Sequence, residues 1–146
     1  EVLFVLAAVL GRILVAGRAN GCTRHARRVP ACRTAVNAWG LEIYCAGPTV
    51  YRPGLTGLMP PEGIDADAVR KVIYERFDMS LGTGLGKMKG RMFRIGHLGD
   101  CNDLMLMATL TGCEMGLQMA GMKLQSSGVL AAMDYLGGQT VPLRRN

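Results

Sequence analysis

Paired cysteines of the kind that bind zinc are missing from this sequence. The five cysteines form no CxxC pair, and only two histidines accompany them, His25 and His97. The sequence therefore predicts no metal site. The odd number of cysteines, in a chain without a clear secretory signal, favours reduced thiols and a cytoplasmic location.

Aromatic and charged residues are also scarce, at 5% and 19% of the sequence. Because 49% of the residues are hydrophobic, the low charge does not indicate a disordered chain. Glycine and methionine are abundant instead, with 20 and 10 residues, which predicts many tight turns and an adaptable interior. The 146 residues fit one domain that is long enough to bury a real core.

No apolar run is long enough to span a bilayer. Residues 2–10 are wholly apolar and the pattern resumes at 13–16 after Arg12, which is too short and too interrupted for a spanning helix. We therefore expect no membrane partner. The apolar side chains lie all round such a helix and must pack against something, so that without a partner they form an aggregation-prone patch.

Most of the net charge of +6 comes from arginines that precede every acid except Glu1, namely Arg12, Arg18, Arg24, Arg27, Arg28 and Arg33. Such a stripe is suited to nucleic-acid phosphates. However, no aromatic side chain lies among these arginines to stack on bases, and no nucleic-acid-binding motif is present. A solvated helix face or a contact with another domain is the preferred interpretation, and a basic nucleic-acid-binding module stays an alternative. Pro30 predicts that the helix kinks or ends within this stretch.

From Gly40 onward the sequence alternates between short strands and helices. Strands are predicted at 41–45, 55–59, 79–81 and 92–95. Helices are predicted after Asp65 through Phe77, at 102–120, and after Ser126 or Ser127, the last one burying Val129, Leu130, Met133 and Leu136. These elements predict an α/β fold (an α+β small domain), with a short mixed or antiparallel sheet covered by helices on one face.

The run from Gly82 to Lys87 superficially resembles a phosphate-binding loop. It lacks the spacing of a P-loop and the Ser or Thr that follows the P-loop lysine, and it does not match the dinucleotide-binding fingerprint. We therefore predict a flexible connection whose glycines adopt positive φ.

Arg94 is the candidate functional residue, a single arginine on a predicted short strand. Its planar guanidinium can bind both oxygens of a carboxylate, and a strand holds it more rigidly than a loop. No nucleophile or base with a partner accompanies it, so we predict no catalytic residue. His97 lies in the turn that follows, and Asp100 is expected to cap the next helix.

Several segments resemble one known family. Residues 65–136 resemble the C-terminal small domain of serine–glyoxylate aminotransferase, a class V, fold-type I enzyme that uses pyridoxal phosphate (PLP). The most diagnostic part is Arg94-Ile95-Gly96-His97-Leu98-Gly99-Asp100, and the segments at 24–27 and 35–43 resemble the region that links the two domains of the family. The resemblance implies a linker helix region at 1–39, a small domain at 40–136 and a loose tail at 137–146.

What the resemblance implies for function is specific. Arg94 corresponds to the arginine that binds the substrate carboxylate, and His97 lies near the substrate-binding site, in a role that is either binding or structural. The full-length enzyme would be a homodimer that transfers the amino group of serine or alanine to glyoxylate. PLP and the lysine that holds it belong to a large domain, so we expect this chain to be a fragment that is inactive and binds no cofactor alone. A non-catalytic remnant that acts as an interaction domain is the remaining alternative.

Overall fold

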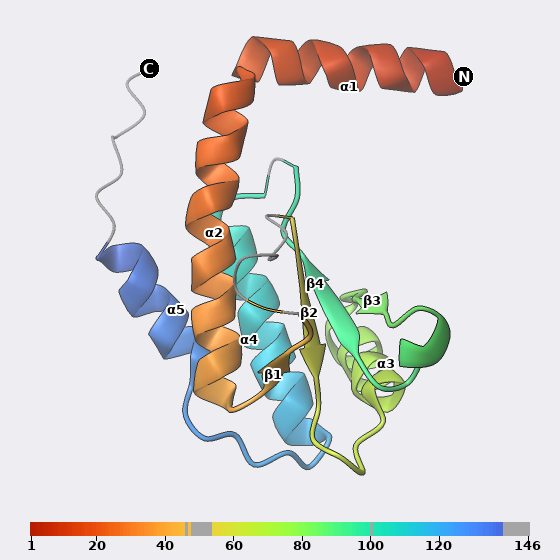
Figure 1. Cartoon of the computed structure of the whole chain (residues 1–146), viewed down its shortest axis with the longest axis vertical. Helices are drawn as coiled ribbons and strands as arrows, with labels where there is room; N and C mark the ends of the chain where they lie inside the picture. The colour runs from red at the N-terminus through yellow and green to blue at the C-terminus, as the bar shows by residue number, and fades with distance from the viewer. Residues whose placement is uncertain (46, 48–53, 100, 139–146) are drawn as a thin grey trace.

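The computed structural model of the chain describes residues 1–45, 47, 54–99 and 101–138. Figure 1 shows helices α2 (Arg18–Trp39), α4 (Asp103–Met119) and α5 (Gly128–Gly137) packed together beside a small sheet. Helix α3 (Ala66–Phe77) packs against α4 and the sheet. None of the helices within the described ranges is long and apolar enough to cross a membrane.

The sheet is antiparallel throughout and has the strand order β1-β2-β4-β3. Its strands are β1 (Glu42–Ile43), β2 (Leu55–Met59), β3 (Gly82–Thr83) and β4 (Phe93–Gly96). Because side chains alternate along a strand, β2 and β4 turn one set of residues into the core and the other set to the opposite face. The core-facing set is buried and consists of Thr56, Leu58, Phe93 and Ile95. The expected α+β small domain, with helices on one face of a short sheet, is confirmed.

The strand at 79–81 was predicted wrongly. Strand β3 begins at Gly82, where Gly82 pairs with Arg94 and Thr83 with Phe93. The Leu81 carbonyl instead accepts a hydrogen bond from the Arg70 side chain, at 2.8 Å, which keeps that residue out of the ladder.

The expected positive φ is found at one glycine of the run only. Only Gly86 has a positive φ, of 54°, and it opens the 3₁₀ helix η2 (Gly86–Met88). Gly84 instead allows the backbone of Met88 to come close, since a Cβ at Gly84 would collide with the Met88 carbonyl. These glycines shape a compact turn between β3 and β4.

Helix α3 matches its prediction. Asp65 is the N-cap, and its side chain accepts a hydrogen bond from the Asp67 amide at 2.9 Å. Val69 and Ile73 face the core. Gly116 of α4 lets the two helices come close, because a Cβ at that position would collide with the Ile73 side chain.

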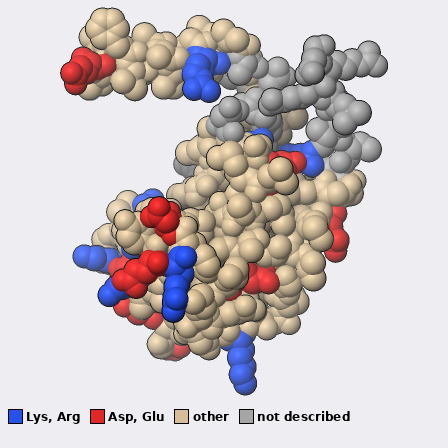
Figure 2. Space-filling model, turned by 180° about the vertical axis from the view of Figure 1, so that it is seen from behind, with Lys and Arg blue, Asp and Glu red and all other residues tan. Residues whose placement is uncertain are grey.

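The expected long N-terminal helix is two helices. Helix α1 (Val2–Ala16) ends at Gly17, whose φ of 79° breaks the path before α2 begins. Figure 1 shows α1 extending away from the body. Glu1 and Arg12 are the charged side chains of residues 1–16, and Figure 2 shows this arm as mostly uncharged surface. Its apolar side chains are exposed on all sides, with Phe4 at 83% and Leu14 at 80%.

The sequence predicted that α2 kinks or ends near Pro30, and the helix does not end there. The helix continues for more than two turns beyond it, to Trp39. Proline removes one backbone hydrogen bond, but the residues around it, Val29, Ala31, Cys32 and Ala35, are buried in the core. Their packing holds the helix together through the proline.

The two C-terminal helices match the predictions in part: α4 has a different cap, and α5 buries a different face. Asn102 is the N-cap of α4, where its side chain accepts a hydrogen bond from the Met105 amide; Asp100 lies outside the described residues. The predicted stripe of Leu106, Leu110, Cys113 and Leu117 is buried as expected.

Helix α5 is capped by Ser127, one of the two predicted caps. Of its predicted buried face only Leu136 is fully buried, while Leu130 and Met133 are exposed. The helix instead buries its small residues Gly128 and Ala132. A Cβ at Gly128 would lie 2.5 Å from the Ala35 carbonyl oxygen, so close packing against α2 selects the face that carries small residues. The helix runs through Gly137, and residues 139–146 of the expected loose tail lie outside the described residues.

Candidate functional site

Arg94 lies on the sheet face that points away from the core. It is the second residue of β4, between the buried residues Phe93 and Ile95, and it is itself half-buried. Its partners on both neighbouring strands are glycines, Gly57 on β2 and Gly82 on β3. Since Gly82 has no side chain, the Arg94 side chain can lie over it, and a Cβ at Gly82 would be only 3.2 Å from the Arg94 Nε. The Met92 side chain covers Gly57 in the same way, where a Cβ would lie 2.6 Å from its terminal methyl group.

One nitrogen of the guanidinium is held by the protein. The Arg94 Nε donates a hydrogen bond to the Thr83 carbonyl at 2.9 Å. Within the described residues no hydrogen bond or ion pair involves the two terminal nitrogens. Those nitrogens form the fork that matches the two oxygens of a carboxylate.

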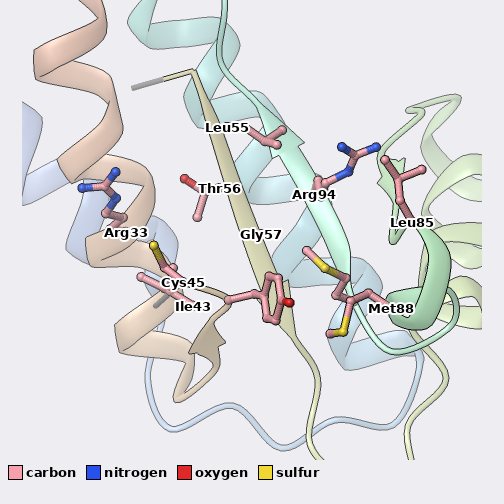
Figure 3. Close-up of a pocket in the computed structure, with 11 residues that line it drawn as sticks. Arg33, Ile43, Cys45, Leu55, Thr56, Gly57, Leu85, Met88 and Arg94 are labelled. Carbon is pink, nitrogen blue, oxygen red and sulfur yellow. The ribbon is translucent and has the colours of Figure 1, made fainter. Parts of the chain in front are cut away.

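Hollows lie on both sides of Arg94. One has a volume of about 350 Å³, and its lining includes Tyr44, Leu85 and Met88. The other has a volume of about 370 Å³, and its lining includes Ser80 and Thr109. Figure 3 shows Arg94 and Met88 on one side of β2, and Arg33 and Cys45 on the other.

His97 lies on the opposite side of the sheet from Arg94. It is buried, with 1% of its surface exposed, and its Nε2 shares a hydrogen bond of 2.9 Å with the Thr56 hydroxyl. Its Nδ1 has no hydrogen-bond partner. Burial, helped by the positive charges of Arg33, His25 and Arg28, lowers the pKa of His97 to about 4. The histidine is therefore neutral at physiological pH. It lines neither of the two hollows beside Arg94, although its partner Thr56 lines the first of them.

Two of the N-terminal arginines point into the protein. Arg27 forms an ion pair with Asp103 at 3.0 Å and donates a hydrogen bond to the Leu136 carbonyl. Arg28 lies 3.5 Å from the same carboxylate and is 5% exposed. These two side chains join α2 to the start of α4 and the end of α5. They do not form part of an exposed basic stripe.

The support of Arg94 was not predicted from the sequence. Asp67 on α3 accepts hydrogen bonds from the Thr83 hydroxyl at 2.9 Å and from Arg70 at 2.7 Å. The Arg70 bonds hold the Asp67 pKa below its ordinary value, and the Thr83 bond lowers it further. The only local signal in the sequence was the spacing of three residues between Asp67 and Arg70, which places them on one helix face.

The described residues do not fit a PLP site by themselves. PLP chemistry needs a lysine that binds the cofactor and an acid beside the pyridine nitrogen. No described residue that lines the two hollows is a lysine or an acid. Lys71 lies on the outer surface of α3, 3.8 Å from Glu75. The described part of the chain also contains no group of three metal-binding side chains.

The fold defines a small domain of the aminotransferase type. The crystal structure of pyridoxamine–pyruvate aminotransferase from Mesorhizobium loti superposes with a TM-score of 0.81 at 30% identity. The match covers 88% of this chain and 33% of that one. No protein-family model matches the chain.

Curated relatives give a more specific result. Serine–glyoxylate aminotransferase of Methylorubrum extorquens is 40% identical over 135 residues, covering 92% of this chain and 34% of that protein. L-aspartate–glyoxylate aminotransferase of Paracoccus denitrificans is 39% identical over 125 residues, covering 85% and 32%. The chain thus spans about a third of the length of these relatives. The chain is homologous to the C-terminal third of class V, PLP-dependent glyoxylate aminotransferases. The resemblance inferred from the sequence is confirmed.

Proposed function

We propose that this chain is the C-terminal, substrate-binding part of an aminotransferase that moves the amino group of serine or alanine to glyoxylate. The observation that carries the proposal is Arg94, which lies on the open sheet face with its terminal nitrogens free of partners among the described residues. The identity of 40% to a serine–glyoxylate aminotransferase supports the choice of substrates.

In this proposal Arg94 binds the carboxylate of each substrate in turn. Amino donor and glyoxylate both carry a carboxylate next to the reacting carbon, so one guanidinium fork can orient both. PLP supplies the electron sink for the transfer when it is bound. The lysine and the acid that PLP needs lie outside this chain in the proposed enzyme, so this chain alone does not transaminate. His97 stays a weaker candidate for substrate binding, because its buried position favours a structural role.

The proposal can be tested in a fusion enzyme, in which this chain replaces the matched third of the Methylorubrum extorquens enzyme. We expect the fusion enzyme to bind PLP and to transfer the amino group of serine to glyoxylate. Arg94→Lys should raise KM for both substrates strongly, because an ammonium group loses the bidentate geometry. Glu75→Ala, at an exposed position of α3, is the matched control and should leave KM and kcat unchanged.

Two outcomes would contradict the proposal. A fusion enzyme that folds and binds PLP without transaminating any amino acid would argue against the aminotransferase function. An Arg94→Lys variant with unchanged KM and kcat would argue against the role of Arg94.

We further propose a homodimeric, cytoplasmic enzyme. The cytoplasmic location is supported by the five cysteines, all of which have free thiols. Burial raises the pKa of the Cys32 thiol to about 11 and raises the pKa of Cys113 as well, so both are unreactive core residues. Light scattering on the fusion enzyme tests the dimer, and imaging of the tagged natural protein tests the location.

A further inference from the structure

Strand β3 is too short to hold its own position. It contains only Gly82 and Thr83, and it lies at the edge of the sheet, where β4 is its single neighbour. A two-residue edge strand makes few ladder hydrogen bonds, so its position depends on contacts outside the sheet.

Helix α3 provides these contacts at both ends of the strand. Before the strand, the Arg70 Nε donates to the Leu81 carbonyl at 2.8 Å. Within it, the Thr83 hydroxyl donates to the Asp67 Oδ1 at 2.9 Å. The same Oδ1 accepts from the Arg70 Nη1 at 2.7 Å, which locks the two helix side chains together.

Strand β3 in turn fixes the plane of the Arg94 guanidinium. The Thr83 carbonyl accepts from the Arg94 Nε at 2.9 Å, and the side chain passes Gly82 on the neighbouring strand. Because a guanidinium is planar, a hydrogen bond at Nε also sets the direction of the two terminal nitrogens. Thr83 therefore links Asp67 to Arg94, through its hydroxyl on one side and its carbonyl on the other.

We propose that Asp67 and Thr83 are positioning residues that aim the Arg94 fork at the substrate carboxylate. The inference rests on the proposed function for its substrate but not for its geometry. Neither residue contacts the substrate in this proposal. Asp67 acts through Thr83, and Thr83 acts through its carbonyl on Arg94.

The geometry is tested first on the chain itself, by NMR. The signal of the Arg94 Nε–H is identified by its loss in Arg94→Lys, and its exchange with solvent is measured. Thr83→Val removes the hydroxyl but keeps the backbone carbonyl. We expect the Arg94 Nε–H to exchange about three- to tenfold faster in this variant, because the net contribution of one hydrogen bond corresponds to a change of about that factor in an equilibrium. Thr83→Ser keeps a hydroxyl and should restore slow exchange, and Asp67→Asn should fall between.

The functional half is tested in the fusion enzyme. Thr83→Val should raise KM for serine about three- to tenfold with a smaller change in kcat, since the carboxylate contact is misaligned rather than removed. Thr83→Ser should restore KM. The exposed α3 residue Glu75, changed to Ala, should alter neither KM nor the Arg94 exchange rate.

Each result decides a different part of the inference. Unchanged Arg94 exchange in both Thr83→Val and Asp67→Asn would overturn it, whether or not the fusion enzyme is active. If Thr83→Val speeds the exchange of the Arg94 Nε–H but leaves KM for serine unchanged, the positioning role is overturned, and the contact between Thr83 and Arg94 is purely structural. An inactive fusion enzyme with the expected exchange rates would count against the proposed function alone. Circular dichroism of each variant identifies a loss of folding, and the Thr83→Ser comparison keeps the test valid if Asp67→Asn does not fold.

Discussion

Replacing Glu114 of α4 should destabilise the chain. Its carboxylate joins three helices. Oε2 accepts from the Trp39 indole at 2.7 Å and from the Val129 amide at 2.9 Å, while Oε1 accepts from the Ser127 hydroxyl at 2.8 Å. Trp39 belongs to α2, and Ser127 and Val129 form the beginning of α5.

The expected loss in the free energy of unfolding can be estimated from the groups that lose their hydrogen-bond partner in Glu114→Ala. Trp39 is 1% exposed, so its indole N–H loses its acceptor and gains no water, which costs about 1–3 kcal/mol. The start of α5 also loses a negative charge that stabilises its N-terminus, by about 0.3–1 kcal/mol. We therefore expect the free energy of unfolding to fall by about 3 kcal/mol, from a typical total of about 5–15. Glu114→Gln keeps one acceptor oxygen and should cost about half of this.

The assay is urea unfolding followed by the fluorescence of Trp39, the only tryptophan in the chain, with circular dichroism as a second probe. Met115→Ala, at the adjacent exposed position of α4, is the control and should change stability by less than about 0.5 kcal/mol. If Glu114→Ala were as stable as this control, the three-helix link would contribute nothing and the reasoning would be refuted.

The pH dependence gives an independent check. Partial burial raises the pKa of Glu114, but the hydrogen bonds from Trp39, the Val129 amide and Ser127 outweigh it, so the pKa lies below its ordinary value of 4.5. A lowered pKa stabilises the fold above the ordinary value and ceases to do so as the pH falls through the folded-state pKa. The stability difference between the natural chain and Glu114→Gln should therefore shrink below about pH 4.5.

Three further predictions concern other parts of the chain. Because the pKa of His97 is lowered from 6.5 to about 4, the free energy of unfolding should fall by about 2 kcal/mol between pH 7 and pH 5, as measured by urea unfolding. His97→Gln should remove this part of the pH dependence, and an equal pH dependence in the two chains would contradict the prediction. Gly82→Ala places a Cβ 3.2 Å from the Arg94 side chain and should raise KM for serine in the fusion enzyme, whereas Gly137→Ala at the end of α5, which meets no atom within 4 Å, should not. Phe4→Lys with Leu14→Lys should reduce concentration-dependent self-association in sedimentation velocity, because both side chains are exposed on α1; unchanged association would place the contact elsewhere.

Local patterns in the sequence predicted local structure well. Helix α3 begins at Asp65 and buries Val69 and Ile73 as expected, because a cap and an apolar stripe are determined within a few residues. Strand β2 has the predicted bounds of Leu55–Met59 for the same reason, since a proline-rich segment ends it.

Features that depend on distant residues were missed. The buried face of α5 is set by how closely Gly128 approaches α2, which no pattern within α5 indicates. The site shows the same division. Arg94 was chosen as the candidate from its predicted strand and from the resemblance to a family, and its binding role stays a prediction. The hydrogen bond between Asp67 and Thr83, which supports Arg94, joins residues 16 positions apart and is seen only in the folded chain.

On the proposed function, the partial exposure of Arg94 explains why it would act together with a second domain. An ion pair that solvent can reach is worth about 0–1 kcal/mol, which corresponds to a dissociation constant of about 0.2 M or weaker for a carboxylate bound by Arg94 alone. The two hollows beside Arg94 make its guanidinium accessible to substrate, but they make it accessible to water as well. The same pair becomes several times stronger when a surface covers the open face and excludes water, because the effective dielectric constant falls. On the proposed function, this chain therefore supplies the direction of the carboxylate contact, and the domain that covers the open face supplies most of its strength.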